Sequence, residues 1–277
     1  RNLAALVMTR VSAFGRDRDR AVVIGDIGRE AQRHLGMERA ERVGQRPAMR
    51  RVASWTFGGR VLPPPPDWGA HVHVTGYWFL DHPPDWQPPA DLVDFLESGP
   101  PPIYVGLGSI SSRDPEKTSR IVLDALRQSG QRGVIATGWV GLSQSDLPDE
   151  VFVTEAVPHD WLFPLMAAVV HHGGAGTTAA GFRSGIPNVV VPFAADQPFW
   201  GARVHAIGAG PQPIPVKKLT AEKLIGALIE ADGDTLRGSA QAVGRKIRAE
   251  DGVGDAVNLI EAHVNKWHAT IKSKYFK

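Results

Sequence analysis

The sequence of 277 residues contains no cysteine, which excludes disulfide frameworks, thiolate metal sites and cysteine nucleophiles. It also lacks any run of eighteen apolar residues, the length that an ordinary membrane-spanning helix needs. No signal peptide is recognisable, and we expect a cytoplasmic protein. With 43% hydrophobic and 22% charged residues, the chain can bury a core and is typical neither of disordered nor of fibrous proteins.

Lysine is absent from residues 1–60, although this segment holds 13 arginines against 6 acidic residues and carries a net charge of +7. The remaining residues carry −5. Such an arginine-rich segment can contact an anionic membrane or an acidic partner, but a solvated helix face is the favoured explanation. Arginines spread over sixty residues without interleaved aromatic side chains are not a nucleic-acid signature, so no nucleic-acid partner is expected.

Proline divides the chain into three predicted segments. Eleven of the 22 prolines lie in residues 63–102, which indicates a stiff interdomain linker over residues 61–102. Within it, the apolar stretch 71–78 is predicted to contain one strand. Residues 1–60 look mostly helical and are too few to form an independent domain, whereas residues 103–277 have the pattern of a complete domain.

From residue 103 onward, short apolar runs alternate with amphipathic stretches. Asp114-Pro115 opens one predicted helix and Gly130 ends it, while Thr220 caps another that Gly233 closes. A long terminal helix is expected over residues 236–267, interrupted near Gly252 and Gly254. The predicted strands are residues 103–107, 134–137, 151–153, 167–170 and 189–191.

This alternation of near-continuous apolar strands with helices predicts an α/β domain. The sheet is expected to be parallel, with helices on both faces. Ligands of such sheets bind beyond the carboxyl ends of the strands, so the loops at that edge are the ones to examine for function.

The most informative loop is the glycine-rich segment 171–178, His-His-Gly-Gly-Ala-Gly-Thr-Thr, which directly follows a predicted strand. Its glycines allow a tight turn and a close approach of the backbone to a ligand. A helix begins at once, and the unpaired N–H groups of its first turn favour an anion such as phosphate. Thr177 and His172 can add side-chain donors. A glycine-rich packing turn with a buried histidine is the alternative.

The same segment also fits a relaxed dinucleotide-binding fingerprint, Gly174-x-Gly176-x-x-Ala179, with Asp196 twenty residues after the second glycine. This pattern predicts an NAD(P)-dependent oxidoreductase. Two features disagree with it, because the fingerprint usually opens its domain and because Asp196 stands beyond the end of a strand rather than at it.

Three ordered motifs occur at residues 157–163, 171–178 and 192–197, and they are supported by residues 73–78, 106–109 and 138–139. Together they resemble one family, the GT-B glycosyltransferases, and in particular the sterol and lipid glucosyltransferases and the bacterial natural-product enzymes. The resemblance extends over roughly residues 60–265. It implies a Rossmann-like C-terminal donor-binding domain, preceded here by only a remnant of the N-terminal acceptor domain.

The resemblance implies a role for each matching position in binding the donor. Backbone groups near Val157 and His159 would hold a uracil-like base, with Trp161 supporting that loop. The diphosphate would lie against His172, which stabilises the leaving group, and against Gly174, Ala175, Gly176 and Thr177. The sugar hydroxyls would bind Asp196 and Gln197, and the remaining cleft residues are Ser109, Gly138 and Trp139.

The implied reaction is inverting transfer of a hexose from a UDP-sugar to a hydroxyl group of a lipophilic acceptor, namely a sterol, terpenoid, lipid or other natural product. Asp196 and Gln197 favour glucose as the hexose. The UDP-sugar is a co-substrate, and neither a cofactor nor a metal ion is expected. Asp17-Arg18-Asp19 resembles a metal-binding motif of another glycosyltransferase fold, but its alternating charges favour a solvated face.

Two departures from the family pattern limit these assignments. Ala179 and Ala180 stand where plant relatives carry the glutamate that binds ribose, so the ribose partner is unassigned. No glycine-rich strand and turn with a catalytic histidine or aspartate precedes the linker, so the base is expected in a missing acceptor domain. A donor-binding module without activity of its own is therefore a third interpretation.

Docking of residues 1–60 on anionic lipid is a further hypothesis, which would make the protein membrane-peripheral.

Overall fold

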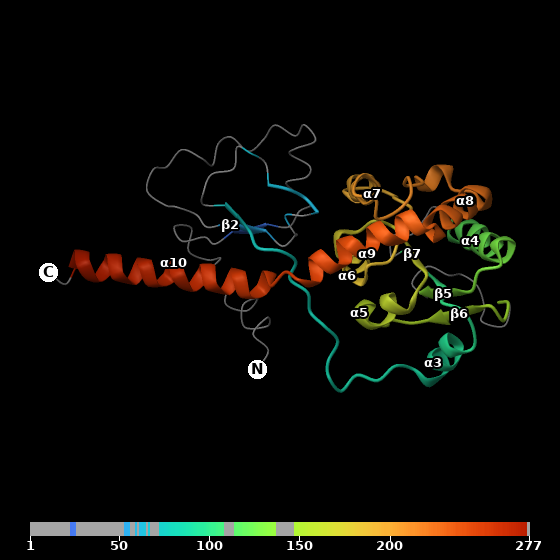
Figure 1. Ribbon diagram of the computed structural model, residues 1–277, viewed down its shortest axis with the longest axis horizontal. Coiled ribbons are helices and arrows are strands. Elements are labelled where there is room, and N and C mark those ends of the chain that lie inside the picture. Colours follow the sequence, from blue (N-terminus) through green and yellow to red (C-terminus); the bar gives the residue numbers. More distant parts are fainter. Residues whose placement is uncertain are drawn as a thin grey trace. The chain divides into compact units, whose positions relative to one another are not determined.

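A computed structural model describes residues 23–25, 53–55, 59, 61–64, 66, 72–107, 114–136 and 147–275 of the chain (Figure 1). The chain divides into two compact units. One unit comprises residues 1–80 and 247–277, and the other comprises residues 81–246. The boundary between residues 80 and 81 falls inside the segment predicted as a linker, and the glycine-rich segment belongs to the second unit.

The second unit is built on a five-stranded sheet of order β6-β5-β4-β7-β8, in which every neighbouring pair is parallel. All five strands predicted from the sequence are confirmed, each to within one residue at either end. They are β4 (Ile103–Gly106), β5 (Gly133–Ala136), β6 (Val151–Thr154), β7 (Ala168–His171) and β8 (Asn188–Val190).

Helices connect these strands, and their ends carry the caps that the sequence predicts. Asp114 accepts a 3.0 Å hydrogen bond from the N–H of Lys117, and Thr220 accepts one of 3.3 Å from Lys223. Gly130 ends the first of these helices with φ 65°, in the left-handed region. The helices of this part are α4 (Pro115–Ser129), α5 (His159–Leu162), α6 (Ala175–Ser184), α7 (Gln197–Ala206), α8 (Ala221–Asp232) and α9 (Asp234–Arg248).

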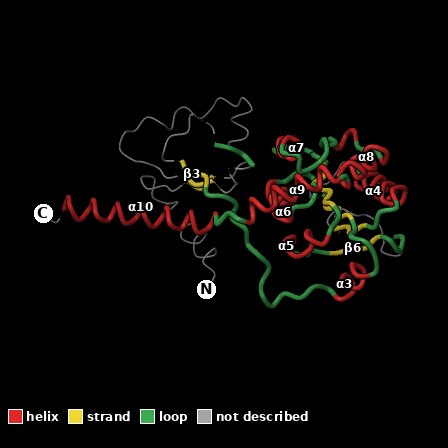
Figure 2. Tube along the Cα trace, in the orientation of Figure 1, coloured by secondary structure: helices red, strands yellow, loops and turns green. Residues whose placement is uncertain are grey.

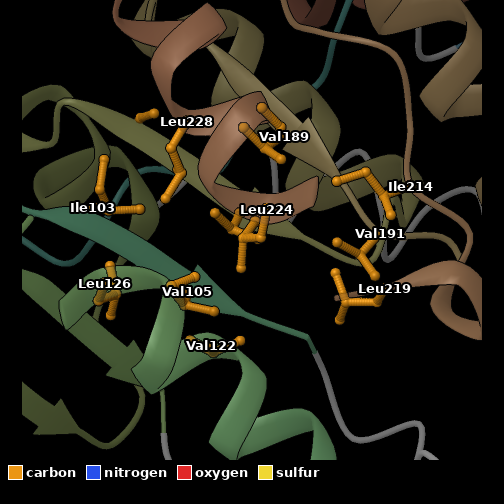
Figure 3. Close-up of a cluster of buried hydrophobic side chains, with 14 of the residues drawn as sticks. Ile103, Val105, Val122, Leu126, Val189, Val191, Ile214, Leu219, Leu224 and Leu228 are labelled. Atoms are coloured by element: carbon orange, nitrogen blue, oxygen red, sulfur yellow. The ribbon is translucent and has the colours of Figure 1, made fainter. Parts of the chain in front are cut away.

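Alternate residues of β4, β5, β6 and β7 enter two separate hydrophobic clusters, one on each face of the sheet. On one face, α4 and α8 pack against Ile103, Val105 and Val189 (Figure 3). On the other face, Tyr104 and Val169 pack with residues of α5 and of the helix α3 (Ala90–Glu97). The predicted two-faced α/β sheet is therefore confirmed.

Helix α3 lies within the proline-rich segment and was not expected from the sequence. Pro89 stands at its N-cap, where a missing N–H costs nothing, so the proline that suggested a linker also begins a helix. The guanidinium of Arg132 holds the other end. It donates to the carbonyl of Pro100 at 2.8 Å and lies 4.1 Å from the centre of the Phe95 ring.

The first unit contains three short parallel strands, two of which lie in the segment predicted to be helical. These strands are β1 (Val23–Gly25), β2 (Ala53–Trp55) and β3 (Val72–Val74), in the order β1-β2-β3. β-Branched and aromatic residues in β1 and β2 favour extended backbone over helix. The strand predicted within residues 71–78 is confirmed as β3.

The predicted terminal helix is confirmed as two helices. α9 ends at Arg248 and α10 (Gly252–Tyr275) begins at one of the two glycines expected to interrupt it (Figure 2). A Cβ at Gly252 would lie 2.5 Å from the carbonyl oxygen of Tyr77, so only glycine fits at this start. None of the helices that the structure describes combines the length and apolar character needed to cross a membrane.

We predict that Leu224→Ala lowers the free energy of unfolding by about 2–5 kcal/mol, because Leu224 is 1% exposed between α8 and the sheet. Ile229→Ala in the same helix is the matched control, since this side chain is 66% exposed, and we expect a loss below about 0.5 kcal/mol. Urea unfolding followed by circular dichroism measures both. Equal losses would contradict the assigned face of α8.

Candidate functional site

The order of strands in the sheet reverses between β4 and β7, which pair side by side with Gly106 opposite His171. The chain segments that follow these two strands diverge to opposite sides of the sheet. In open parallel sheets, this point at the carboxyl edge is where ligands bind. The glycine-rich segment leaves β7 at this point.

The first turn of α6 offers three backbone donors for which the described residues provide no hydrogen-bond acceptor. Its N-cap is Gly174, which has no side chain to cap the helix, and the first intrahelical bond runs from the N–H of Thr178 to the carbonyl of Gly174 at 2.9 Å. The N–H groups of Ala175, Gly176 and Thr177 precede that bond. The Thr178 hydroxyl donates to the same carbonyl at 2.9 Å, so Thr177 provides the hydroxyl that can meet a ligand. This arrangement favours an anion.

Gly173 brings the start of α6 against the start of α7. Its φ of +89° lies in the left-handed region, which favours glycine. A Cβ at this position would come within 2.7 Å of Val190 Cγ1 and 3.0 Å of the carbonyl oxygen of Gln197. No larger residue fits, and the two loops therefore meet at one corner.

His172 lies at this corner, half-buried, and its Nδ1 is buried without a hydrogen-bond partner in the structure. Buried polar atoms are nearly always paired, so an unpaired ring nitrogen at a loop indicates a place for a ligand. Burial lowers the pKa of His172, while the backbone of Gly106 and the charge of Asp196 oppose that shift. The influence of Asp196 on this pKa reflects how near the carboxylate lies to the ring.

Asp196 stands at the N-cap of α7, yet its carboxylate makes no capping hydrogen bond. Instead, Oδ2 accepts a 3.1 Å hydrogen bond from the indole Nε1 of Trp200, a side chain with no exposed surface. The preceding residue, Ala195, has φ 55°, so the chain enters α7 through a strained conformation. One carboxylate oxygen is thereby fixed and the other remains available for a ligand.

Gln197 is only 3% exposed and makes a different use of its side chain from the one expected. Its Oε1 accepts hydrogen bonds from the N–H groups of Phe193, at 2.7 Å, and Ala194, at 3.1 Å. The amide oxygen closes the loop before α7, so only the amide nitrogen is left to contact a sugar hydroxyl.

A pocket of about 340 Å³ opens at the same edge, beyond β4, β5 and β6. His159 forms part of its wall and stacks on Phe163, with ring centres 4.2 Å apart and planes 19° apart. Tyr104 Oη lies 3.5 Å from His159 Nε2. The residues that line the pocket are Tyr104, Ala136, Thr154, Glu155, Ala156, Val157, Pro158 and His159.

The two ionisable rings of this pocket are both neutral at pH 7. Burial raises the pKa of Tyr104 to about 12. Burial also lowers the pKa of His159, against the smaller opposing influence of Asp160. Together with Ala136, Val157 and Pro158, these neutral rings make most of the lining uncharged, with Glu155 as its acidic member, and such a pocket suits an uncharged aromatic group.

Trp161 does not line the pocket but supports the helix behind it. Its ring meets that of Trp86 edge to face, with centres 5.4 Å apart. The neighbouring Asp160 Oδ2 accepts hydrogen bonds from the backbone N–H of His82, at 3.0 Å, and from its ring Nδ1, at 2.7 Å. The chain around residues 81–86 is thus tied to α5, and His82 has a structural role.

Several residues predicted from the sequence lie outside the residues that the structure describes. They are Asp17, Asp19, Ser109, Gly138 and Trp139, and their roles stay predictions. Within the described ranges, no group of three or more His, Asp or Glu side chains is placed to hold a metal ion.

The sequence profile of the family described as "Erythromycin biosynthesis protein CIII-like, C-terminal domain" matches residues 122–257. Residues 122–257 form a domain of this family. The resemblance to GT-B glycosyltransferases noted from the sequence is confirmed, and so is the fold expected from it.

The sequence match to relatives of this GT-B domain covers most of the chain. Sterol 3-beta-glucosyltransferase UGT80A2 of Arabidopsis thaliana is 47% identical over 211 residues, which cover 76% of this chain and 33% of the relative. The chain therefore spans about a third of the length of this relative.

Two solved structures have the same fold at lower sequence identity. The calicheamicin glycosyltransferase CalG4 superposes with a TM-score of 0.63 at 19% identity, over 96% of this chain and 63% of that one. Arabidopsis thaliana UGT89C1, solved in complex with UDP, superposes with a TM-score of 0.61 at 18% identity, over 76% of this chain and 58% of that one.

Two residues of the site were not anticipated from the sequence. Tyr104 lines the pocket, and a Cβ at Gly106 would lie 2.4 Å from its hydroxyl, so the glycine two residues later was a usable signal. Trp200 orients Asp196, and the i, i+4 spacing of the two residues on a predicted helix was the corresponding signal.

We predict that the domain loses stability steadily as pH falls below about 6.5. Burial, with a smaller effect from His172, lowers the pKa of His171 to about 3, and His159 and His172 shift in the same direction. The unfolded chain then binds more protons than the folded one between these pH values. His171 alone contributes a fall of about 1.4 kcal/mol per pH unit in that window.

Urea unfolding at pH 4.5, 5.5, 6.5 and 7.5 measures this dependence. His171→Asn removes one titrating group and should flatten the slope below pH 6.5. Parallel slopes for the variant and the unaltered chain would show that His171 does not titrate in this way.

Proposed function

We propose that this chain supplies the donor-binding half of a glucosyltransferase, which transfers glucose from UDP-glucose to a hydroxyl of a sterol or a similarly lipophilic acceptor. The relative that is 47% identical is named a sterol 3-beta-glucosyltransferase, which supports both the sugar and the acceptor class. The observation that carries the proposal is the uncapped N-terminus of α6 beside the unpaired Nδ1 of His172.

The diphosphate of the donor would bind at the start of α6. The N–H groups of Ala175, Gly176 and Thr177 lie at the positive end of the helix dipole and would face the diphosphate. The Thr177 hydroxyl and His172 would add donors. Because negative charge builds up on the leaving diphosphate, these preplaced donors stabilise the transition state more than the ground state. We propose that this stabilisation takes the place of a metal ion.

The base would occupy the pocket lined by Tyr104, Val157 and His159. The pocket lies beyond β4, β5 and β6 and the anion site follows β7, so the two are one to three strand spacings, or about 5–14 Å, apart along the same edge. A ligand with an uncharged ring at one end and an anion at the other fits this separation. UDP has this composition, and the GT-B neighbour UGT89C1 was solved in complex with it.

The sugar would lie beside α7, where Asp196 presents a free carboxylate oxygen. A carboxylate accepts hydrogen bonds from two neighbouring hydroxyls of a hexose better than a neutral group does. Trp200 fixes the direction of this carboxylate, and the amide nitrogen of Gln197 supplies a donor.

In the reaction, the acceptor oxygen forms a bond to the anomeric carbon on the side opposite the diphosphate. The bond between that carbon and the diphosphate oxygen breaks, its electron pair stays on the diphosphate, and the configuration inverts. The hydroxyl proton passes to a base. We propose that this base belongs to the acceptor-binding part of the enzyme, because His159 and His171 already contact Tyr104 and Asn188.

The site offers less support for an NAD(P)-dependent oxidoreductase. The glycine-rich segment follows the fourth strand of its unit, β7, whereas a dinucleotide fingerprint normally follows the first. A donor-binding module without activity would use the same residues as the transferase, and glucose transfer to a sterol by the chain itself would exclude that alternative. A cytoplasmic location, with contact to anionic membranes, stays part of the proposal.

A thermal-shift panel of UDP, UDP-glucose, TDP-glucose and NAD tests the proposed donor. We expect UDP to raise the melting temperature and UDP-glucose to raise it further, because the free oxygen of Asp196 gains partners. NAD should leave it unchanged. Stabilisation by NAD alone would overturn the proposed function.

We predict that Thr177→Val weakens UDP binding by about 1–3 kcal/mol, because the hydroxyl donor is lost from the start of α6. Thr177→Ser retains the hydroxyl and should bind UDP like the unaltered chain. Isothermal titration calorimetry measures both affinities. If the valine and serine variants bound UDP equally well, the Thr177 hydroxyl would have no role in the site.

A further inference from the structure

His171, the first of the two adjacent histidines, has no exposed surface and no place in the donor contacts proposed above. It is the last residue of β7, with Gly106 of β4 and Val190 of β8 as its neighbours in register. A fully buried polar ring in the middle of a sheet is unfavourable unless both of its nitrogens have partners.

Both ring nitrogens of His171 are hydrogen-bonded, and the partners fix which one carries the proton. Nδ1 accepts the backbone N–H of Gly173 at 3.1 Å. Nε2 lies 3.0 Å from Asn188 Oδ1, and the Asn188 amide nitrogen donates to the carbonyl of Ile186 at 3.0 Å. Because Asn188 uses its nitrogen as a donor, its oxygen must accept, and the proton of His171 lies on Nε2.

Packing around Asn188 makes this arrangement rigid. A Cβ at Gly181 would lie 1.9 Å from Asn188 Oδ1, so α6 approaches the amide at a glycine. The N–H of Asn188 donates to the carbonyl of Ala209 at 2.9 Å. Asn188 therefore holds His171 in one orientation, and His171 in turn holds the N–H of Gly173.

Gly173 is the residue at which the chain turns from β7 into the start of α6. Its backbone has a φ of +89°, and this conformation sets the direction in which the chain continues. Glycine populates many other conformations, so an additional interaction is needed to hold this one. The hydrogen bond to His171 Nδ1 fixes this direction from within the sheet. The three free N–H groups of Ala175, Gly176 and Thr177 begin two residues later.

We propose that His171 is a positioning residue for diphosphate binding: as a neutral hydrogen-bond acceptor braced by Asn188, it fixes the Gly173 N–H and thereby aims the first turn of α6 at the ligand. This inference rests on the proposed function, because it assumes that the first turn of α6 binds the donor. His171 itself does not touch the ligand, which separates its role from that of His172.

Two variants test this role, and each of them retains one of the two hydrogen-bonding functions of His171. His171→Asn places an amide oxygen near the position of Nδ1 and keeps the acceptor for Gly173, whereas His171→Gln places an amide nitrogen near Nε2 and keeps only the donor to Asn188. Both remove the aromatic ring and both are expected to lower the melting temperature. A merely structural role would therefore weaken UDP binding equally in the two.

We expect the dissociation constant for UDP, measured by calorimetry at a temperature where both variants are folded, to rise about tenfold for His171→Gln and less than about threefold for His171→Asn. Equal affinities in the two variants would overturn the inference. Failure of the unaltered chain to bind UDP would instead overturn the proposed function, so the two failures are distinguishable.

A measurement on the unaltered chain keeps the inference testable if a variant does not fold. Nitrogen-15 NMR of the uniformly labelled protein reports which nitrogen of His171 is protonated. We expect a proton on Nε2, none on Nδ1, and a change in the Gly173 amide resonance when UDP is added. A proton on Nδ1 would overturn the inference, since that nitrogen could not then accept a hydrogen bond.

Discussion

The reversal of strand order between β4 and β7 is the constraint on which the rest of the structure depends. It makes the chain leave two neighbouring strands in opposite directions, and an opening at the edge of the sheet follows from the topology. The start of α6 can leave its backbone donors uncapped only because this opening can admit a ligand. The pocket lined by Tyr104 and His159, the carboxylate of Asp196 and the ring of His172 all lie along the same edge.

Several side chains of the site hold other residues of the site in place. Trp200 holds Asp196, Gln197 closes its own loop, and Asn188 holds His171. Each of these supporting side chains is buried, so its hydrogen bond is protected from competing water. A preorganised polar site of this kind loses little energy in rearranging when a charged ligand arrives.

The sequence was sufficient to predict the sheet and the main motifs, because apolar runs and caps are local signals. Asp114, Gly130 and Thr220 act where the pattern placed them. Helix α3 was missed because proline at a helix start and proline in a linker look alike without the structure. The strands near residues 23 and 53 were missed because arginine-rich surroundings obscured two very short extended runs.

The finer features of the site could not be predicted because they depend on contacts between distant residues. Nothing local shows that the amide oxygen of Gln197 is already occupied, and the i, i+4 spacing of Asp196 and Trp200 allows their contact without showing that it replaces a cap on α7. Of the two adjacent histidines, His172 was the one expected to contact the ligand, but the residue pattern alone does not show that His171 is fully buried while His172 is half-buried. That distinction follows from the alternation of side chains at the end of a strand whose last residue the sequence pattern does not fix.

The contact of Gly173 with Val190 and Gln197 has a consequence for how sugar preference changes among related enzymes. In the proposed function, the loop before α6 receives the phosphate and the loop before α7 receives the sugar. Because the two loops meet at Gly173, neither can shift without displacing the other. Evolution of a new donor preference would then proceed through exchange of side chains on a constant backbone, and loop insertions would be confined to the surrounding segments.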